Sequence, residues 1–267
     1  MIFLTGELIL RFSPEIGSSM KKKIKIALIG FGKMGQEIDR LCHESENFEI
    51  VSISFKNKDE DLDVRGIAQA DIAIDFTSRA VVVKNIERVA KLGINLVIGT
   101  TGWYDKMETA KRAVATQKIG LVYSSNFSIG ANIFFKMTAF SSKLFAKFPD
   151  YDVYGLEIHH GGKSDSPSGT ALKIANEILE NFPSKKSVLA EKLDRQIDAS
   201  ELHFASVRGG RNPGFHQVVF DSAADGITLS HQAYSRVGFA KGALLAAEFI
   251  KNKKGVYSFE DVLAKII

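Results

Sequence analysis

The stretch IKIALIGFGKMG, Ile24 to Gly35, decides the fold of this chain. Its first seven residues are a short apolar run rich in β-branched side chains, which predicts a buried strand. The glycine turn GFGKMG (30–35) follows directly, and the helical pattern KMGQEIDRLCHE (33–44) begins within it. A strand, a glycine turn and a helix in this order are the context of a dinucleotide-binding fingerprint, although six residues alone are a weak signal.

The three glycines have separate roles in such a motif. Gly30 permits the tight turn, Gly32 lets the backbone approach a pyrophosphate, and Gly35 lets helix and strand pack closely. The start of the helix offers unpaired N–H groups and a positive dipole to phosphate oxygens. The sequence therefore predicts nucleotide binding at this turn.

Strands and helices alternate outward from this stretch. The predicted strands are 24–30, 48–55, 71–76, 94–102 and 119–126, and the clearest helices between them are 33–44, 79–93 and 104–117. Alternation at this spacing indicates a parallel, doubly wound sheet of the Rossmann type.

The pattern changes after residue 127. Two helices and a strand are predicted at 128–148, 167–182 and 151–160, and the polar segment 183–200 is expected to be a loop. Three strands joined by short turns, at 202–210, 215–223 and 226–235, suggest an antiparallel sheet, and two helices at 236–253 and 258–266 end the chain. The fold class is thus α/β: a Rossmann-like domain, an inserted α+β domain with a mainly antiparallel sheet, and a C-terminal helix that returns to the first domain.

This organisation predicts four segments. They are an upstream extension (1–19), a dinucleotide-binding domain (20–127), a substrate-binding and oligomerisation domain (128–237), and C-terminal helices that pack on the first domain (238–267). In the extension, Glu7, Arg11 and Glu15 interrupt every apolar run, so no signal peptide is predicted, and Met20 is interpreted as the natural start.

Composition bounds the class of protein. Of 267 residues, 45% are hydrophobic and 25% are charged, as in an ordinary soluble globular protein. The net charge of +4 comes from scattered lysines and arginines, which argues against nucleic acid as a partner. No apolar run approaches the roughly eighteen residues of a membrane span. The single cysteine, Cys42, excludes an intrachain disulfide and indicates a reducing compartment.

The segment after the second predicted strand concerns the choice of cofactor. An acid there would bind the ribose 2′-hydroxyl of NAD, but the sequence SFKNKDED (54–61) places Lys56 and Lys58 before its first acid, Asp59. Cations at this place suit a 2′-phosphate, so NADPH is predicted over NADH. A loop that is merely solvated is the alternative.

The next three strands end in small and hydroxyl residues: DFTS (75–78), GTTG (99–102) and SSNFS (124–128). Ligands of an open parallel sheet lie beyond the carboxyl ends of its strands, and small residues there leave room for a nicotinamide ring. Each of these ends could equally be a helix N-cap. Three in succession favour a ligand crevice.

The stretch EIHHGGKSDSPSGTA (157–171) concentrates proton carriers and cations. Alternation along its strand places Glu157 and His159 on one face and His160 on the other. Ser168, Gly169 and Thr170 begin a helix whose N–H groups would bind an anion, and Lys163 adds a charge beside them. An anionic substrate held here, with a histidine alongside to move a proton, forms a coherent device.

Two other interpretations of this stretch stay open. A metal is not predicted, because adjacent histidines on a strand point apart and a third ligand is not evident. The histidines could also be merely packed. Further on, Arg208, Arg211 and His216 lie around glycines and could contact a second carboxylate, although a structural or lid role is favoured.

The stretch closely resembles the E-x-H-H-x-x-K-x-D-x-P-S-G-T-A signature of the 4-hydroxy-tetrahydrodipicolinate reductases, also called dihydrodipicolinate reductases. The motifs GFGKMG, DFTS, GTTG, SSNFSIGAN, VRGG-x-x-x-G-x-H and GFAKGAL-x-AAEF also occur in the family's order, from about Ile24 to the C-terminus. The resemblance implies NAD(P)H-dependent reduction of a cyclic dicarboxylate to tetrahydrodipicolinate in lysine (diaminopimelate) biosynthesis. It also implies a cytoplasmic homotetramer assembled through the sheet of the second domain.

The resemblance implies roles for individual residues. His159 is expected to be the catalytic acid/base and Lys163 the proton donor. Those expected to hold the substrate carboxylates are His160, Lys163, Ser168, Gly169 and Thr170. Those expected to contact the cofactor are Gly30, Phe31, Gly32, Lys33, Met34, Gly35, Gly99, Thr100, Thr101, Ser124, Ser125, Asn126 and Phe127, with Lys56 added for the 2′-phosphate.

Two departures from the family concern the cofactor rather than the reaction: the glycine turn is one residue shorter than the common form, and the acid after the second strand is absent. Two alternative functions also remain. A related dehydrogenase of another small carboxylate, such as an aspartate dehydrogenase, would keep the nucleotide domain. A non-catalytic nucleotide sensor would need no proton carriers.

Overall fold

The first sheet is parallel and has six strands in the order β11-β5-β4-β3-β1-β2. It is seen in a computed structural model that describes residues 22–55 and 61–266, so the extension 1–19 and the cofactor residue Lys56 lie outside the described residues. Its strands are β1 (Ile24–Ile29), β2 (Phe48–Ser54), β3 (Ile72–Asp75), β4 (Asn95–Ile98), β5 (Gly120–Tyr123) and β11 (Gly255–Ser258). The five predicted strands are confirmed, and β11 is an additional edge strand beside β5.

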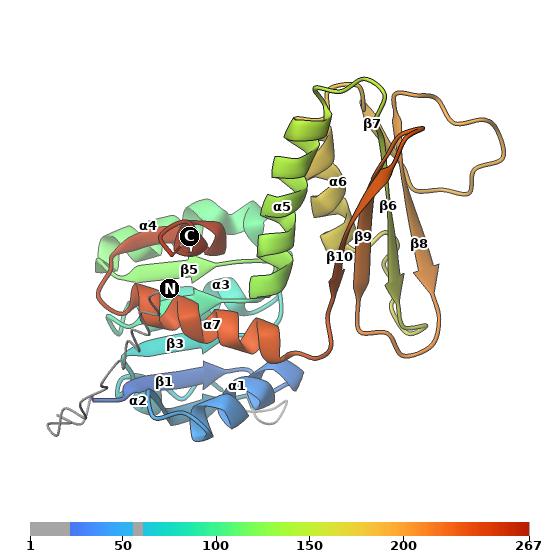
Figure 1. Cartoon of the computed structure of the whole chain (residues 1–267). Coiled ribbons are helices and arrows are strands. Elements are labelled where there is room, and N and C mark those ends of the chain that lie inside the picture. The colour runs from blue at the N-terminus through green and yellow to red at the C-terminus, as the bar shows by residue number, and fades with distance from the viewer. Residues whose placement is uncertain (1–21, 56–60, 267) are drawn as a thin grey trace, which may run out of the picture.

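Helices cover both faces of this sheet because β1 is apolar on both sides. Ile26 and Leu28 face one core, which they share with three helices, and Ala27 and Ile29 face the other. The helices of the first core are α1 (Lys33–His43), α7 (Val237–Ile250) and α8 (Phe259–Leu263), and those of the second are α2 (Val64–Ile67), α3 (Val82–Ala90) and α4 (Met107–Gln117). The C-terminal helix α7 therefore returns to the first sheet, as predicted (Figure 1).

The glycine turn has the geometry that its sequence predicts. Gly30 has φ +94°, a conformation that other residues resist. A Cβ at Gly35 would overlap the Gly30 carbonyl oxygen, so only glycine lets α1 pack this closely on the turn. A Cβ at Gly32 would meet no described atom within 4 Å, which leaves that side of the turn open to a ligand.

The second sheet is mixed rather than mainly antiparallel. Its strands are β6 (Asp152–His159), β7 (Ser187–Leu189), β8 (Glu201–Arg208), β9 (Phe215–Asp221) and β10 (Gly226–Gln232), in the order β10-β9-β6-β8-β7. Although a short connection joins β8 to β9, β6 lies between them, parallel to β8 and antiparallel to β9. Local periodicity identifies a strand but does not specify its neighbours. The segment 183–200, predicted to be a loop, contains β7, which extends this edge parallel to β8.

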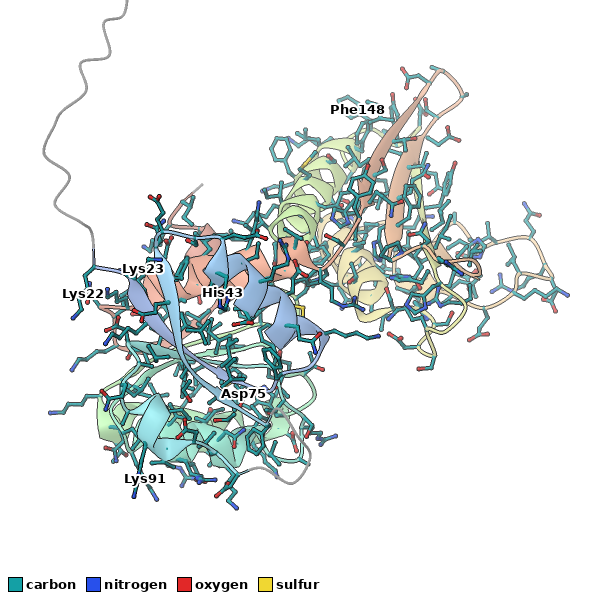
Figure 2. The ribbon with its side chains drawn as sticks, turned by 90° about the horizontal axis from the view of Figure 1, so that it is seen from below. Lys22, Lys23, His43, Asp75, Lys91 and Phe148 are labelled. Atoms are coloured by element: carbon teal, nitrogen blue, oxygen red, sulfur yellow. The ribbon has the colours of Figure 1, made fainter. Side chains whose placement is uncertain are left out.

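Two helices cover one face of the second sheet (Figure 1). They are α5 (Ile129–Phe145) and α6 (Gly169–Asn181), which pack together and close a third core with Val153, Phe204 and Val218 from the strands. Figure 2 shows the two halves of the molecule beside each other, with Lys91 on the first and Phe148 on the second. Within the described ranges, none of the helices combines the length and apolar character needed to cross a membrane.

The return of α7 depends on one glycine. A Cβ at Gly242 would overlap the carbonyl oxygen of Phe127, in the segment between β5 and α5. We expect Gly242→Ala to lower the free energy of unfolding by about 1–3 kcal/mol, the usual cost of overpacking. The measurement is urea denaturation.

The matched control is Gly238→Ala in the same helix, where a Cβ would make only an ordinary contact, 3.7 Å from Ser128 Oγ. Because alanine is the better helix former, this variant should be neutral or slightly stabilising. Equal losses in both variants would contradict the packing argument.

Candidate active site

Two cavities lie side by side between the two halves of the molecule. The larger, about 960 Å³, is lined by Lys33 and Met34 of α1 and by His160 and Arg211 of the second half. The smaller, about 880 Å³, is lined by the ends of β5 and β6 and the start of α6. Their shared lining residues are Ser125, His160, Pro213 and Phe239. The glycine turn and the EIHHGGKSDSPSGTA loop therefore open onto one continuous crevice.

The loops on the first side of the crevice are held by the buried carboxylate of Asp75, at the end of β3 (Figure 2). Its Oδ1 accepts hydrogen bonds from Thr77 N at 2.8 Å and Thr100 Oγ1 at 3.1 Å, and its Oδ2 accepts one from Asn85 Nδ2 at 2.9 Å. Burial raises the pKa of Asp75. Thr100, one of the expected cofactor residues, thus turns its hydroxyl toward Asp75.

The other expected cofactor residues divide between the cavities. Those on the larger cavity are Lys33, Met34, Gly99, Ser125 and Phe127, and those on the smaller are Thr101, Ser124, Ser125 and Asn126. Gly30, Phe31, Gly32 and Gly35 form the turn behind Lys33 and Met34.

The turn and the start of α1 fit the phosphates of a dinucleotide. Gly32 is the N-cap of α1, and it makes no side-chain capping bond, so the first N–H groups of the helix are available to an anion. Lys33 adds a positive charge at the rim of the larger cavity. A site of this size, with donors and a cation at one end, is suited to a nicotinamide cofactor.

On the second side of the crevice, Glu157 is fully buried at the centre of a polar cluster. Its Oε1 accepts hydrogen bonds from Ser168 N at 2.8 Å, Ser206 Oγ at 2.9 Å and Arg208 Nη2 at 2.6 Å. Its Oε2 accepts one from Ser168 Oγ. Burial acts to raise the pKa of Glu157, but hydrogen bonds from His216, Ser168 and Arg208 outweigh it and lower the pKa well below its usual range.

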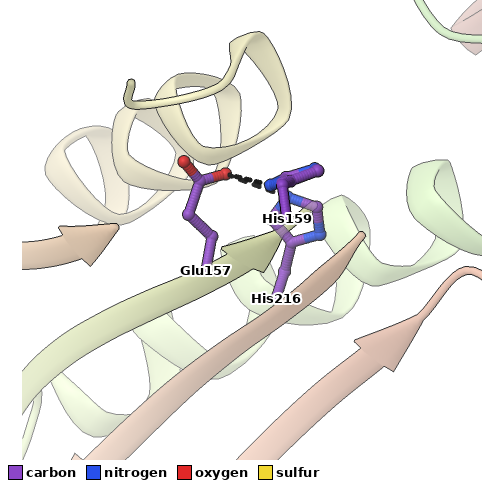
Figure 3. Close-up of side chains that lie close together, drawn as sticks. All are labelled: Glu157, His159 and His216. Carbon is purple, nitrogen blue, oxygen red and sulfur yellow. Dashed lines mark ion pairs between the residues drawn. The ribbon is translucent and has the colours of Figure 1, made fainter. Parts of the chain in front are cut away.

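Two imidazoles lie close to Oε2 of Glu157, on the same side of the carboxylate (Figure 3). His159 Nδ1 lies 3.2 Å from this oxygen and His216 Nε2 lies 3.5 Å from it. Burial lowers the pKa of His159 to about 4, and the neighbouring His216, Lys163 and Arg208 add to this effect against the opposing charge of Glu157. His159 is therefore neutral at pH 7, with an unprotonated ring nitrogen.

These three groups are close enough to hold a metal ion, since their ligand atoms lie within 4.8 Å of one another. His216 is the third possible metal ligand, which the sequence did not reveal. However, Arg208 already neutralises the carboxylate, and His216 Nδ1 has no hydrogen-bond partner among the described residues. A metal-bound histidine almost always donates its other N–H to an acceptor. The donor set thus favours an acid–base cluster over a metal centre.

The remaining expected residues surround the smaller cavity. Lys163 Nζ lies 2.7 Å from Asp165 Oδ1, and His160 is exposed on the crevice. Ser168 caps α6, but Glu157 already uses both of its donors. The N–H groups that this helix start can offer an anion are therefore those of Gly169 and Thr170.

Sequence reasoning left the roles of several site residues open or missed them. Arg208 and His216 belong to the buried cluster, Arg208 also donates to Asp165 O at 2.7 Å, and Arg211 lines the larger cavity. Glu157 was placed on the same strand face as His159 but was not given a role. A carboxylate predicted to be buried needs partners, and that signal could have identified it.

A Rossmann-like sheet with an open glycine turn, facing a loop that carries a neutral histidine and a lysine beside a helix start, defines a nicotinamide-dependent oxidoreductase of a small acid. The comparisons with known proteins specify the family. The family model described as "Dihydrodipicolinate reductase, N-terminus" matches residues 24–127. The model described as "Dihydrodipicolinate reductase, C-terminus" matches residues 130–263. This chain belongs to the dihydrodipicolinate reductase family, and the predicted family and enzyme class are confirmed.

Named relatives and a solved structure agree with this assignment. The chain is 37% identical to the 4-hydroxy-tetrahydrodipicolinate reductase of Christiangramia forsetii, covering 91% of this chain and 99% of that one. It is 36% identical to the enzyme of the same name from Methanosarcina acetivorans, covering 89% and 88%. A dipicolinate-bound dihydrodipicolinate reductase from Paenisporosarcina sp. TG-14 is 26% identical, with a TM-score of 0.71 over 89% of this chain and 98% of that one.

The buried His159 makes stability depend on pH. Its pKa is about 4 in the folded protein and about 6.5 in an unfolded chain, so the folded state binds fewer protons between these values. Stability from this group is complete above pH 6.5 and is lost as pH falls toward 4, by at most about 3 kcal/mol. We expect His159→Gln to flatten the fall in melting temperature over this range. The same substitution at the exposed His43 is the control and should leave the fall unchanged.

Proposed function

We propose that this chain reduces 4-hydroxy-tetrahydrodipicolinate, a cyclic dicarboxylate, to tetrahydrodipicolinate in lysine biosynthesis. The observation that carries the proposal is the single crevice shared by the glycine turn and the loop of His159, His160 and Lys163. Relatives at 36–37% identity carry the name of this reaction, and one solved relative is described as bound to dipicolinate, a ring dicarboxylate. When bound, a nicotinamide cofactor supplies the hydride.

The residues of the chain would bind the substrate and move the proton. The N–H groups of Gly169 and Thr170 and the charged end of Lys163 would hold one carboxylate, and His160, which lines both cavities, would hold the other. Ser168 would support carboxylate binding indirectly, because it caps the helix whose first N–H groups would hold the carboxylate. The net reaction consumes one hydride and one proton and releases the 4-hydroxyl group as water. Lys163 would deliver the proton that completes the reduction, and His159 would act as an acid/base that accepts and returns a proton, so that it is unchanged after each turnover.

The predicted segments of the chain would have separate tasks. Residues 20–127 would bind the cofactor, residues 128–237 the substrate and neighbouring subunits, and residues 238–267 would anchor the second domain to the first. Asn126 Nδ2 lies 3.4 Å from Thr170 Oγ1, so the cofactor side already contacts the substrate side. Closure about such contacts would exclude water from the reacting atoms.

We also propose a cytoplasmic homotetramer that assembles through the second sheet. The sheet face opposite α5 and α6 carries Tyr154, Leu156, Ile158 and Val207, of which Tyr154 is 42% and Val207 50% exposed. An apolar sheet face of this kind is suited to burial against another copy. The single cysteine agrees with a reducing compartment.

The test of the function is NADPH oxidation, followed by absorbance, with freshly prepared dihydrodipicolinate-pathway intermediate as substrate. Oxaloacetate with ammonia is the comparison mixture, because an aspartate dehydrogenase would oxidise NADPH with these comparison substrates. Oxidation with the pathway intermediate alone supports the proposal. Oxidation with the comparison substrates alone, or binding of nucleotide with no oxidation at all, contradicts it.

Lys163→Ala should lower kcat by at least about a hundredfold, since it removes a proton donor. The measurement is steady-state NADPH oxidation at saturating substrate. Lys111→Ala is the control, because Lys111 also pairs with an acid, Glu108 at 2.8 Å, but lies on α4 outside both cavities. Near-normal turnover of the Lys163 variant would remove this residue from the mechanism.

We propose NADPH as the preferred cofactor, on the basis of the cations that follow β2. Lys56→Ala should raise KM for NADPH about tenfold and leave KM for NADH within about twofold, since only NADPH carries the 2′-phosphate. The ratio of kcat/KM for the two cofactors is the measurement. An equal change for both would show that Lys56 does not contact this phosphate.

A further inference from the structure

The carboxylate of Glu157 connects four elements of the second half: β6, β8, β9 and the start of α6. It bonds the cap of α6 through Ser168, the strand β8 through Ser206 and Arg208, and lies beside His159 of β6 and His216 of β9. Arg208 extends the connection to the loop of Lys163 through Asp165 O. The substrate-binding donors and the proton carrier are thus fixed relative to one another by a single side chain.

The position of Glu157 determines which nitrogen of His159 is free to react. Nδ1 is buried and makes no hydrogen bond to any described residue, and Oε2 of Glu157 lies 3.2 Å away. An ionised carboxylate only accepts hydrogen bonds, so a hydrogen on Nδ1 is stabilised there and a lone pair on Nδ1 is not. The tautomer of a histidine is set in this way by the partner of its other nitrogen.

The opposite nitrogen of His159 is kept uncovered. A Cβ at residue 214 would lie only 3.1 Å from His159 Nε2, and this residue is Gly214. His159 also lines the smaller cavity, which its buried Nδ1 does not reach. Nε2 is therefore the atom that can exchange a proton with a ligand.

His216 limits the movement of the His159 ring and of the Glu157 carboxylate. Its ring is 5.2 Å from that of His159 in an edge-on arrangement, and its Nε2 lies 3.4 Å from Ser168 Oγ and 3.5 Å from Glu157 Oε2. His216 is itself buried, so it fills the space into which the His159 ring or the carboxylate could otherwise turn. Its role is to support the geometry rather than to contact a substrate.

We propose that Glu157, supported by His216, is a positioning residue that holds His159 as the Nδ1–H tautomer with Nε2 toward the substrate. This inference deepens the proposed function and rests on it for its effect on turnover. It assigns no reaction step to Glu157 itself. The role resembles that of the buried aspartate which orients the histidine of a serine protease, where loss of the charge leaves the wrong tautomer and a large drop in kcat.

The first measurement uses the unaltered protein. Imidazole 15N–1H correlation spectra, with the His159 signals identified by their loss in His159→Gln, report the tautomer near pH 7 directly. We expect the Nδ1–H form. A dominant Nε2–H form would overturn the proposal, whether or not any variant folds and whether or not the proposed reaction is found.

The second measurement uses Glu157→Gln. Glutamine keeps an oxygen for Ser168 and Ser206 but can also donate to Nδ1, so we expect a mixture of tautomers in the spectrum. We expect kcat to fall by about 10²–10⁴ and substrate KM to stay within about threefold, because the start of α6 is preserved. An unchanged kcat would reduce Glu157 to a structural role. An unchanged tautomer, with kcat and substrate KM impaired to the same extent, would do the same.

The matched control is Glu201→Gln. Glu201 also pairs with an arginine, Arg195, at 2.6 Å on the same sheet, but it lines neither cavity. We expect normal kcat and an unchanged His159 spectrum. If Glu157→Gln does not fold, His216→Gln serves instead: it should lower kcat about tenfold at unchanged KM, and an unaltered kcat would overturn the supporting role of His216. Absence of any turnover in the unaltered enzyme would defeat the proposed function, while the tautomer result would still stand.

Discussion

The second half of the molecule depends on the burial of one ionised carboxylate. A charge taken out of water costs several kcal/mol unless it is paired and hydrogen-bonded, and Glu157 is fully buried. Arg208 neutralises it, while Ser168 and Ser206 satisfy its remaining lone pairs. Because these partners come from separate elements, the requirement to solvate this charge fixes the start of α6 against β6 and β8. The N–H groups of Gly169 and Thr170 take their position from the same arrangement.

In the first half, a second buried carboxylate has a similar role on the other side of the crevice. Asp75 ends β3 and is fully buried, and it draws Thr77, Asn85 and Thr100 toward itself from the segments after β3 and β4. Asp75 differs from Glu157 because its partners are neutral, and burial raises its pKa instead of lowering it. Each wall of the crevice is thus shaped by a buried carboxylate that does not itself line either cavity. The cations Lys33, Lys163 and Arg211 do line the cavities, together with the acids Glu37, Asp165 and Glu260. Such cations are complementary to an anionic ligand.

Much of this could be predicted from the sequence because the signals are local. The apolar run of β1, the glycine turn and the helix start at Ser168 to Thr170 each involve a few adjacent residues, and all are found where expected. The strand order of the second sheet could not be predicted, because the periodicity of β8 and β9 does not indicate that β6 lies between them. The same limit hid His216: it is far from His159 along the chain, and only the pairing of β9 with β6, which places it opposite Glu157, brings the two histidines together.

The placement of His159 beside this cluster keeps its imidazole unprotonated. Burial, His216, Lys163 and Arg208 all lower the pKa of His159, so the imidazole stays neutral until a negative charge enters the cavity. A ligand with two carboxylates brings negative charge into the same cavity, and an opposite charge at short range favours the protonated form. Substrate binding would therefore itself raise the affinity of Nε2 for a proton. Since Glu157 favours a hydrogen on Nδ1, the additional proton would be taken up on Nε2, which faces the reacting ring. The supply of protons would then be coupled to the presence of substrate.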